Sequence, residues 1–212
     1  MPNAEIIKQI LSVVPLAVLL LSLGAAGTSL GLLQANINNG MRSRCNFFIS
    51  YTQAMDSSLV NYNEPTCKLS IASATIATIC LALLTAIELI RVSFHINVKT
   101  SIAKIIQVGI YVGSILFLFI TTIVVSAGWG KTCATYNNLS RTGITPNSYF
   151  KINCNGPQHS YGYGPYPPNG ADFIAAAVFA CVSAVLAAGA LCYCIVKQMR
   201  SKDHDNELTP TN

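Results

Sequence analysis

The residues of this sequence that could do chemistry are one acid inside an apolar run, three histidines and eight cysteines. The acid is Glu88, in the run LLTAIELIRV. Acidic residues within membrane spans are rare and often serve proton or ion pathways. However, Glu88 precedes Arg91 by three residues, so an i,i+3 ion pair near the end of the run is the simpler interpretation. A transport path lined by Glu88 is the alternative.

The histidines are far apart and lack the spacing of metal ligands; they are His95, His159 and His204. The sequence also has no glycine-rich phosphate loop and no motif that would gather a serine, a histidine and an aspartate. We therefore predict that the protein is not an enzyme and that it holds no metal and no cofactor.

Four of the cysteines lie in the two long polar segments of the chain, two in each segment: Cys45, Cys67, Cys133 and Cys154. Paired thiols are typical of an oxidising compartment. Four cysteines allow three connectivities. We favour the pairs Cys45–Cys67 and Cys133–Cys154, because each would close its own segment near the bilayer. Unpaired thiols, or pairs between the two segments, are the alternatives.

Two further cysteines, Cys192 and Cys194, lie beside basic residues at the end of the last apolar run, in LCYCIVKQMR. Cysteines next to a membrane in such surroundings are typical sites of reversible palmitoylation. The alternative is that both are ordinary small buried residues.

The elements that must position these residues are four long apolar stretches. The chain has 212 residues, of which 52% are hydrophobic and 10% are charged, whereas about 25% of an ordinary globular protein is charged. Each stretch has the roughly 20 residues that cross a hydrocarbon core, and a helix pairs the backbone polar groups within itself. We therefore predict an all-α membrane protein, a four-transmembrane-helix bundle with two extracellular loops.

The predicted boundaries follow these stretches. The first apolar run is too long for the core of a signal peptide, so it is interpreted as a transmembrane helix. The transmembrane helices are 10–33, 69–92, 103–127 and 173–196; the extracellular loops are 34–68 and 128–172; the cytosolic segments are 1–10, 93–102 and 197–212.

Charge and a glycosylation motif favour cytosolic termini. Counted to the membrane ends, the predicted cytosolic segments 1–10, 91–104 and 197–212 have seven lysines and arginines in forty positions, whereas the extracellular segments 34–69 and 128–172 have six in eighty-one. Basic residues concentrate on the cytosolic side of membrane proteins. Asn138, in Asn-Leu-Ser, is an N-glycosylation acceptor within the second extracellular loop. We predict an integral protein of the plasma membrane or of a secretory-pathway membrane.

Small residues are expected where helices pack, because burial away from lipid gives little hydrophobic gain and close approach matters more. We predict that the alanine-rich stretch 173–196 and five glycines form packing faces within the bundle. For any of these faces, binding of a partner's transmembrane helix is the alternative. Trp129, just past the third helix, is predicted to be an anchor at the membrane interface. The five glycines are Gly24, Gly27, Gly31, Gly109 and Gly113.

Three short motifs resemble those of the transmembrane protein 179 family. RSRCNFF (42–48) is similar to that family's first-loop cysteine after basic residues, CKLSIAS (67–73) to its cysteine leading into helix two, and TTIVVSAGWGKTC (121–133) to its exit from helix three. The tyrosine- and proline-rich segment 155–170 is not associated with that family. The layout also resembles claudins, MARVEL-domain proteins and tetraspanins, without the claudin or tetraspanin cysteine signatures. The resemblance implies a four-pass membrane protein and no particular activity.

Two hypotheses for function follow. The first is a non-enzymatic four-pass membrane protein that acts through protein–protein contacts, as an accessory subunit, an adhesion element or a membrane organiser. Its partners would be the lipid bilayer and other membrane proteins. The thirteen basic residues form no stripe, so no nucleic-acid partner is predicted. The second hypothesis is a small oligomeric channel or transporter.

Overall fold

A computed structural model describes most of the chain. The backbone is described for residues 2–38, 48, 50–54, 57–61, 64–94, 101–141, 154–155 and 169–207. Side chains are described for 13–36, 48, 65–94, 102–135, 154–155, 169–197 and 199.

Four long helices make up the fold: α1 (Pro2–Asn38), α2 (Glu64–Phe94), α3 (Ser101–Arg141) and α4 (Gly170–Glu207). All four are long and apolar enough to cross a membrane, over Val13–Asn36, Pro65–Phe94, Ile102–Thr135 and Gly170–Lys197. The predicted four-helix membrane bundle is confirmed, and the chain is an integral membrane protein.

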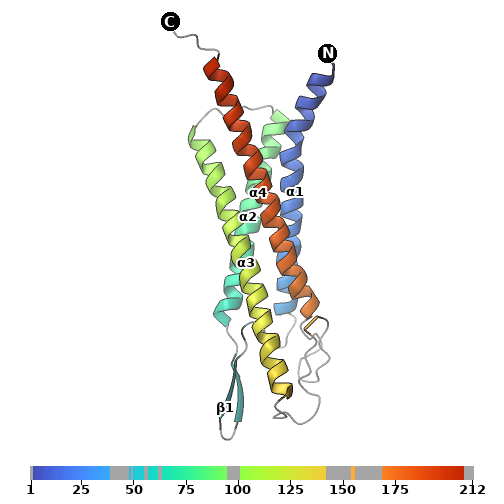
Figure 1. The fold of residues 1–212 in the computed structure, drawn as a ribbon, viewed down its shortest axis with the longest axis vertical. Coiled ribbons are helices and arrows are strands. Elements are labelled where there is room, and N and C mark those ends of the chain that lie inside the picture. Colours follow the sequence, from blue (N-terminus) through green and yellow to red (C-terminus); the bar gives the residue numbers. More distant parts are fainter. Residues whose placement is uncertain are drawn as a thin grey trace.

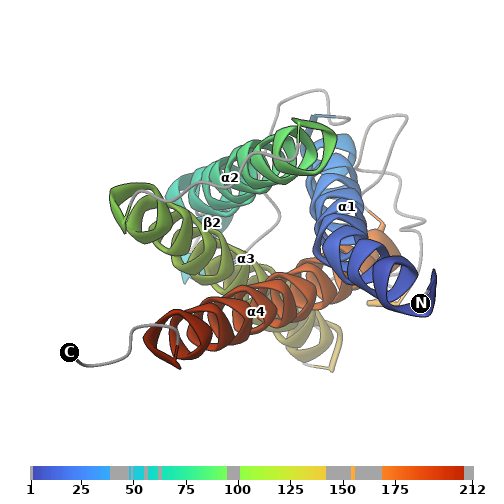
Figure 2. The same cartoon turned by 90° about the horizontal axis from the view of Figure 1, so that it is seen from above.

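The helices form a ring in chain order, in which each helix packs against the one before it and α4 returns to α1. Viewed from above, α1 and α3 therefore occupy opposite corners (Figure 2). The start of α1 and the end of α4 lie at one end of the bundle, which we call the termini end (Figure 1). The opposite end carries the two strands and a disulfide bond, and we call it the disulfide end.

All four helices are longer than the transmembrane segments predicted from hydropathy, and α2 begins at Glu64 rather than at residue 69. α3 continues fourteen residues beyond the predicted limit at 127, and α4 continues eleven residues beyond 196. α1 begins at Pro2 rather than at residue 10. No proline interrupts 128–141 or 197–207, so the helical hydrogen-bonding pattern continues after the apolar composition ends.

A small β-hairpin lies in the first interhelical segment, where no strand was predicted. β1 (Ser50–Ala54) and β2 (Ser57–Asn61) pair antiparallel, with Ser50 opposite Asn61 and Ala54 opposite Ser57. The two intervening residues, Met and Asp, lack the Asn-Gly or Asp-Gly signal of a tight hairpin turn. The residues between β1 and β2 therefore carry no strong sequence signal for a hairpin.

The centre of the bundle is apolar and closely packed. Alanines of α4 face leucines from the other three helices, and Leu81, Leu84 and Leu118 have almost no exposed surface. The buried alanines of α4 are Ala176, Ala177, Ala180, Ala184, Ala187 and Ala190. The packing face predicted for the alanine-rich stretch is thus present between the helices of this chain.

Serine hydroxyls join α1 to α4 along this packed face. Ser22 Oγ donates to the Ser183 carbonyl at 3.0 Å, and Ser183 Oγ donates to the Ser22 carbonyl at 2.8 Å. Ser29 Oγ donates to the Ala176 carbonyl at 2.7 Å. Because these hydroxyls bond the backbone of the facing helix, they hold α1 close to α4 and fix which side of α1 faces inward.

Candidate functional site

A polar cluster lies between α2 and α3 toward the termini end. Arg91 Nη1 donates to Glu88 Oε1 at 2.7 Å, which is the predicted ion pair. Gln107 on α3 completes the cluster: its Nε2 donates to Glu88 Oε1 at 2.8 Å, and its Oε1 accepts from Arg91 Nη2 at 3.1 Å. Glu88 is only 4% exposed. We call these three residues the polar latch.

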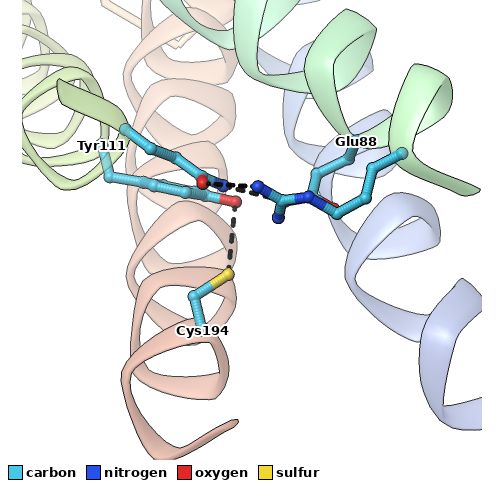
Figure 3. Close-up of polar contacts among 5 residues, drawn as sticks. Glu88, Tyr111 and Cys194 are labelled. Carbon is cyan, nitrogen blue, oxygen red and sulfur yellow. Dashed lines mark hydrogen bonds and ion pairs between the residues drawn. The ribbon is translucent and has the colours of Figure 1, made fainter. Parts of the chain in front are cut away.

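Tyr111 and Cys194 extend the latch toward α4. Tyr111 lies one turn after Gln107 on α3 and is fully buried. Its hydroxyl contacts the Cys194 thiol at 4.0 Å. Glu88, Tyr111 and Cys194 come from three different helices and point toward one another (Figure 3). The latch and this contact together connect α2, α3 and α4.

The five glycines predicted to pack within the bundle do not do so. A Cβ atom added at Gly24, Gly27, Gly31, Gly109 or Gly113 would meet nothing within 4 Å. Four of them are exposed and Gly113 is half-buried. The prediction is wrong because α1 turns the face with Leu19, Ser22 and Ser29 inward. On α3 the inward face carries Gln107 and Tyr111. The glycines of the two helices are therefore left on the outer surface.

At the disulfide end, α3 and the second interhelical segment are joined by a disulfide. Cys133 bonds Cys154 over a Cα–Cα distance of 5.8 Å, which is the pairing predicted for these two residues. Trp129, one turn earlier on α3, donates its indole N–H to the Cys154 carbonyl at 3.0 Å. Its ring also packs on Phe173 of α4, with 4.9 Å between ring centroids. The disulfide and the hydrogen bond hold the turn at Cys154 against the end of the bundle.

The contacts of Trp129 correct its predicted role. Its side chain is 5% exposed and belongs to an apolar cluster that includes Leu33, Cys67 and Phe173. An interfacial anchor would have its indole at the headgroups, but this indole hydrogen bonds to the protein itself. The helical continuation of α3 explains the difference, because it places Trp129 over α4 rather than in a loop.

The first interhelical segment is tied to the same end. Cys67, at the start of α2, is disulfide-bonded, and Cys45, its predicted partner, lies outside the described residues. Phe48 donates its backbone N–H to the Gly128 carbonyl at 3.3 Å, and the Lys131 ammonium lies 5.8 Å from the centre of its ring. Phe48 has a φ of 53°, a left-handed conformation that is uncommon outside glycine.

The remaining predicted residues are placed as follows. Cys192 is exposed and Cys194 is half-buried, and both are free thiols. Palmitoylation of either stays a prediction. Asn138 lies on α3 rather than in a loop, but its side chain is outside the described residues, as are the side chains of the three histidines. In the described part of the chain, no three His, Cys, Asp or Glu residues are grouped as metal ligands would be.

Sequence reasoning missed Gln107, Tyr111 and Gly170. The first two are polar groups four residues apart in an apolar helix, which places them on one face; that spacing was a usable signal. Gly170 has no such signal, because its role depends on Cys154 and Trp129, which approach it only in the folded chain.

Comparison with protein-family models, curated proteins and solved structures finds no match to this chain.

Proposed function

We propose that this protein is a non-enzymatic membrane protein that works by associating with other transmembrane helices, as an accessory or organising component. The observation that carries the proposal is the outward position of the glycines on α1 and α3. Glycine is a poor residue for a lipid-facing helix interior unless a backbone must approach closely.

Each of the two helices has a pair of these glycines four residues apart. Gly27 and Gly31 are about 6 Å apart along α1, as are Gly109 and Gly113 along α3. On α3 the pair lies between the exposed side chains of Ile105 and Leu116. A groove of this form admits the backbone of a second helix, the basis of GxxxG association in membranes. We call these pairs the α1 seam and the α3 seam.

The second hypothesis, a channel or transporter, has less support. Glu88, the residue that would line its path, is engaged by Arg91 and Gln107. Leu81, Leu84 and Leu118 fill the centre of the bundle. Ion flux through liposomes that contain the purified protein, lost on Glu88→Gln, would favour transport over association.

We further propose that the disulfide end faces the lumen or the extracellular space and that both termini are cytosolic. The Cys133–Cys154 bond supports this orientation, since disulfides persist in oxidising compartments. Glycosylation of Asn138 would agree with it. Protease protection of epitope tags at the termini of the protein in sealed vesicles tests the orientation directly.

Replacing the glycines of each seam with leucine tests the association proposal, because the larger side chains would prevent close approach of a partner helix. Gly27→Leu with Gly31→Leu, and Gly109→Leu with Gly113→Leu, should each reduce crosslinked complexes recovered from native membranes. Because a Cβ atom at these positions would meet nothing within 4 Å in the part of the chain that the structure describes, the added side chains should leave the bundle folded. Retention of the Cys133–Cys154 bond provides the check on folding.

Gly189→Leu is the matched control. Gly189 also has open surroundings, but it has no glycine four residues away on α4. Its substitution should leave the complexes unchanged. If both seam variants are recovered in complexes as abundantly as the unaltered protein, the proposed function is wrong.

A further inference from the structure

The α3 seam and Gln107, the α3 residue of the polar latch, lie on the same two turns of one helix. Successive residues of an α-helix are rotated by about 100°. Gln107 and Gly109 therefore lie roughly 200° apart, and so do Tyr111 and Gly113. The burial agrees: Gln107 and Tyr111 face the bundle interior, whereas Gly109 is exposed. Any rotation that takes Gln107 out of the bundle also takes the α3 seam away from the outer surface.

The apolar side chains of α3 do not set this rotation strongly. In a bilayer a leucine or valine gains little by moving from lipid to protein, and α3 has such residues on every face. A buried amide is different, because hydrocarbon offers it no hydrogen-bond partner. Both polar atoms of Gln107 are bonded to α2, Nε2 to Glu88 and Oε1 to Arg91. These bonds form at one rotation of α3 only.

We propose that Gln107 is a positioning residue: by bonding Glu88 and Arg91 it sets the rotation of α3 about its own axis toward the termini end and keeps Gly109 and Gly113 turned away from the bundle interior. The use of that surface by a partner rests on the proposed function, whereas the rotation itself does not. Glu88 thus acts as the acceptor that orients α3. The Tyr111–Cys194 contact supports the same rotation from α4.

The test measures the rotation of α3 directly. The full-length protein in liposomes is labelled with a lipid-soluble carbene reagent, and the labelled residues are identified by mass spectrometry. In the unaltered protein Val112 and Leu116 should be labelled, since they are 43% and 57% exposed, and Leu118 should be protected at 1%. Gln107→Leu should raise labelling of Leu118 by about threefold to eightfold, the population shift expected from losing one or two intramembrane hydrogen bonds.

Ser114→Ala is the matched control, because Ser114 is buried on the same face but its hydroxyl bonds the Tyr111 carbonyl of its own helix at 2.8 Å. It should leave the labelling pattern unchanged. Gln107→Ser is the second variant, for the case that Gln107→Leu does not fold. Serine is too short to reach α2 and bonds its own backbone instead, so the same rise at Leu118 is expected.

An unchanged pattern in the folded Gln107 variants overturns the inference. The labelling requires no partner, so it distinguishes this failure from a failure of the proposed function. A rotated α3 with no loss of complexes would reject the use of the α3 seam but retain the positioning role of Gln107. If the seam variants lose complexes but α3 of Gln107→Leu keeps its rotation, the use of the α3 seam would be retained and the positioning role of Gln107 rejected.

Discussion

Gly170, at the first residue of α4, lies where no side chain can be accommodated. A Cβ atom there would overlap the Cys154 carbonyl and the Trp129 ring. Two independent ties already hold these neighbours, the Cys133–Cys154 disulfide and the Trp129 hydrogen bond. The glycine is therefore required by the close approach of two backbones, and the clash cannot be relieved by moving a flexible side chain.

We accordingly expect Gly170→Ala to lower the free energy of unfolding by about 1–3 kcal/mol, the usual cost of overpacking. The measurement is equilibrium unfolding in mixed micelles. Gly130→Ala is the control, since Gly130 lies in a helix with open surroundings. It should leave stability unchanged or slightly raised, because alanine is the better helix former. Equal stability of the two variants would contradict this account of Gly170.

At the scale of the helices, serine hydroxyls join α1 to α4. Ser22 and Ser183 each donate to the other's carbonyl across the α1–α4 contact. Hydrogen bonds between transmembrane helices contribute about 0.6 kcal/mol each on average. This contribution to stability is small because the same hydroxyl groups find other hydrogen-bond partners in the membrane when the helices are separated.

The double substitution Ser22→Ala and Ser183→Ala should therefore lower the free energy of unfolding by about 1 kcal/mol, roughly twice that average. Thr28→Ala provides the comparison, because the Thr28 hydroxyl bonds Gly24 of its own helix at 2.9 Å. Unfolding followed in the same micelles should show a smaller loss for Thr28→Ala. A loss as large in the control as in the serine variant would mean that contacts between helices are not the cause.

The four helices were predictable from the sequence, but which side of each helix faces the bundle interior was not. Hydropathy located all four helices, since spanning length and apolar composition are local properties of the chain. It could not show that Gln107 faces the bundle interior and Gly109 faces outward, because which side of an apolar helix faces inward depends on partners such as Glu88 and Arg91 on another helix. The same limit applies to Trp129, whose partners Cys154 and Phe173 are distant in sequence.

For the whole molecule, the Cys133–Cys154 bond closes a segment of the chain with a sequence separation of 21 residues. Such a closure contributes about 3 kcal/mol in the chain-entropy model. The double variant Cys133→Ser and Cys154→Ser should lose about that much stability in thermal unfolding. Cys181→Ser with Cys192→Ser, at exposed free thiols, should lose little. Comparable losses in the two variants would count against a stabilising role for the bond.

The opposite-corner placement of α1 and α3 bears on the size of any assembly. An assembly of a protein with a single seam stops at two subunits, because each subunit has no second seam for another neighbour. On the proposed function, engagement of one seam would leave the other at the opposite corner of the bundle, available to the next molecule. Successive additions would extend in a line across the membrane plane and would not terminate at a pair, so the number of subunits would depend on local abundance.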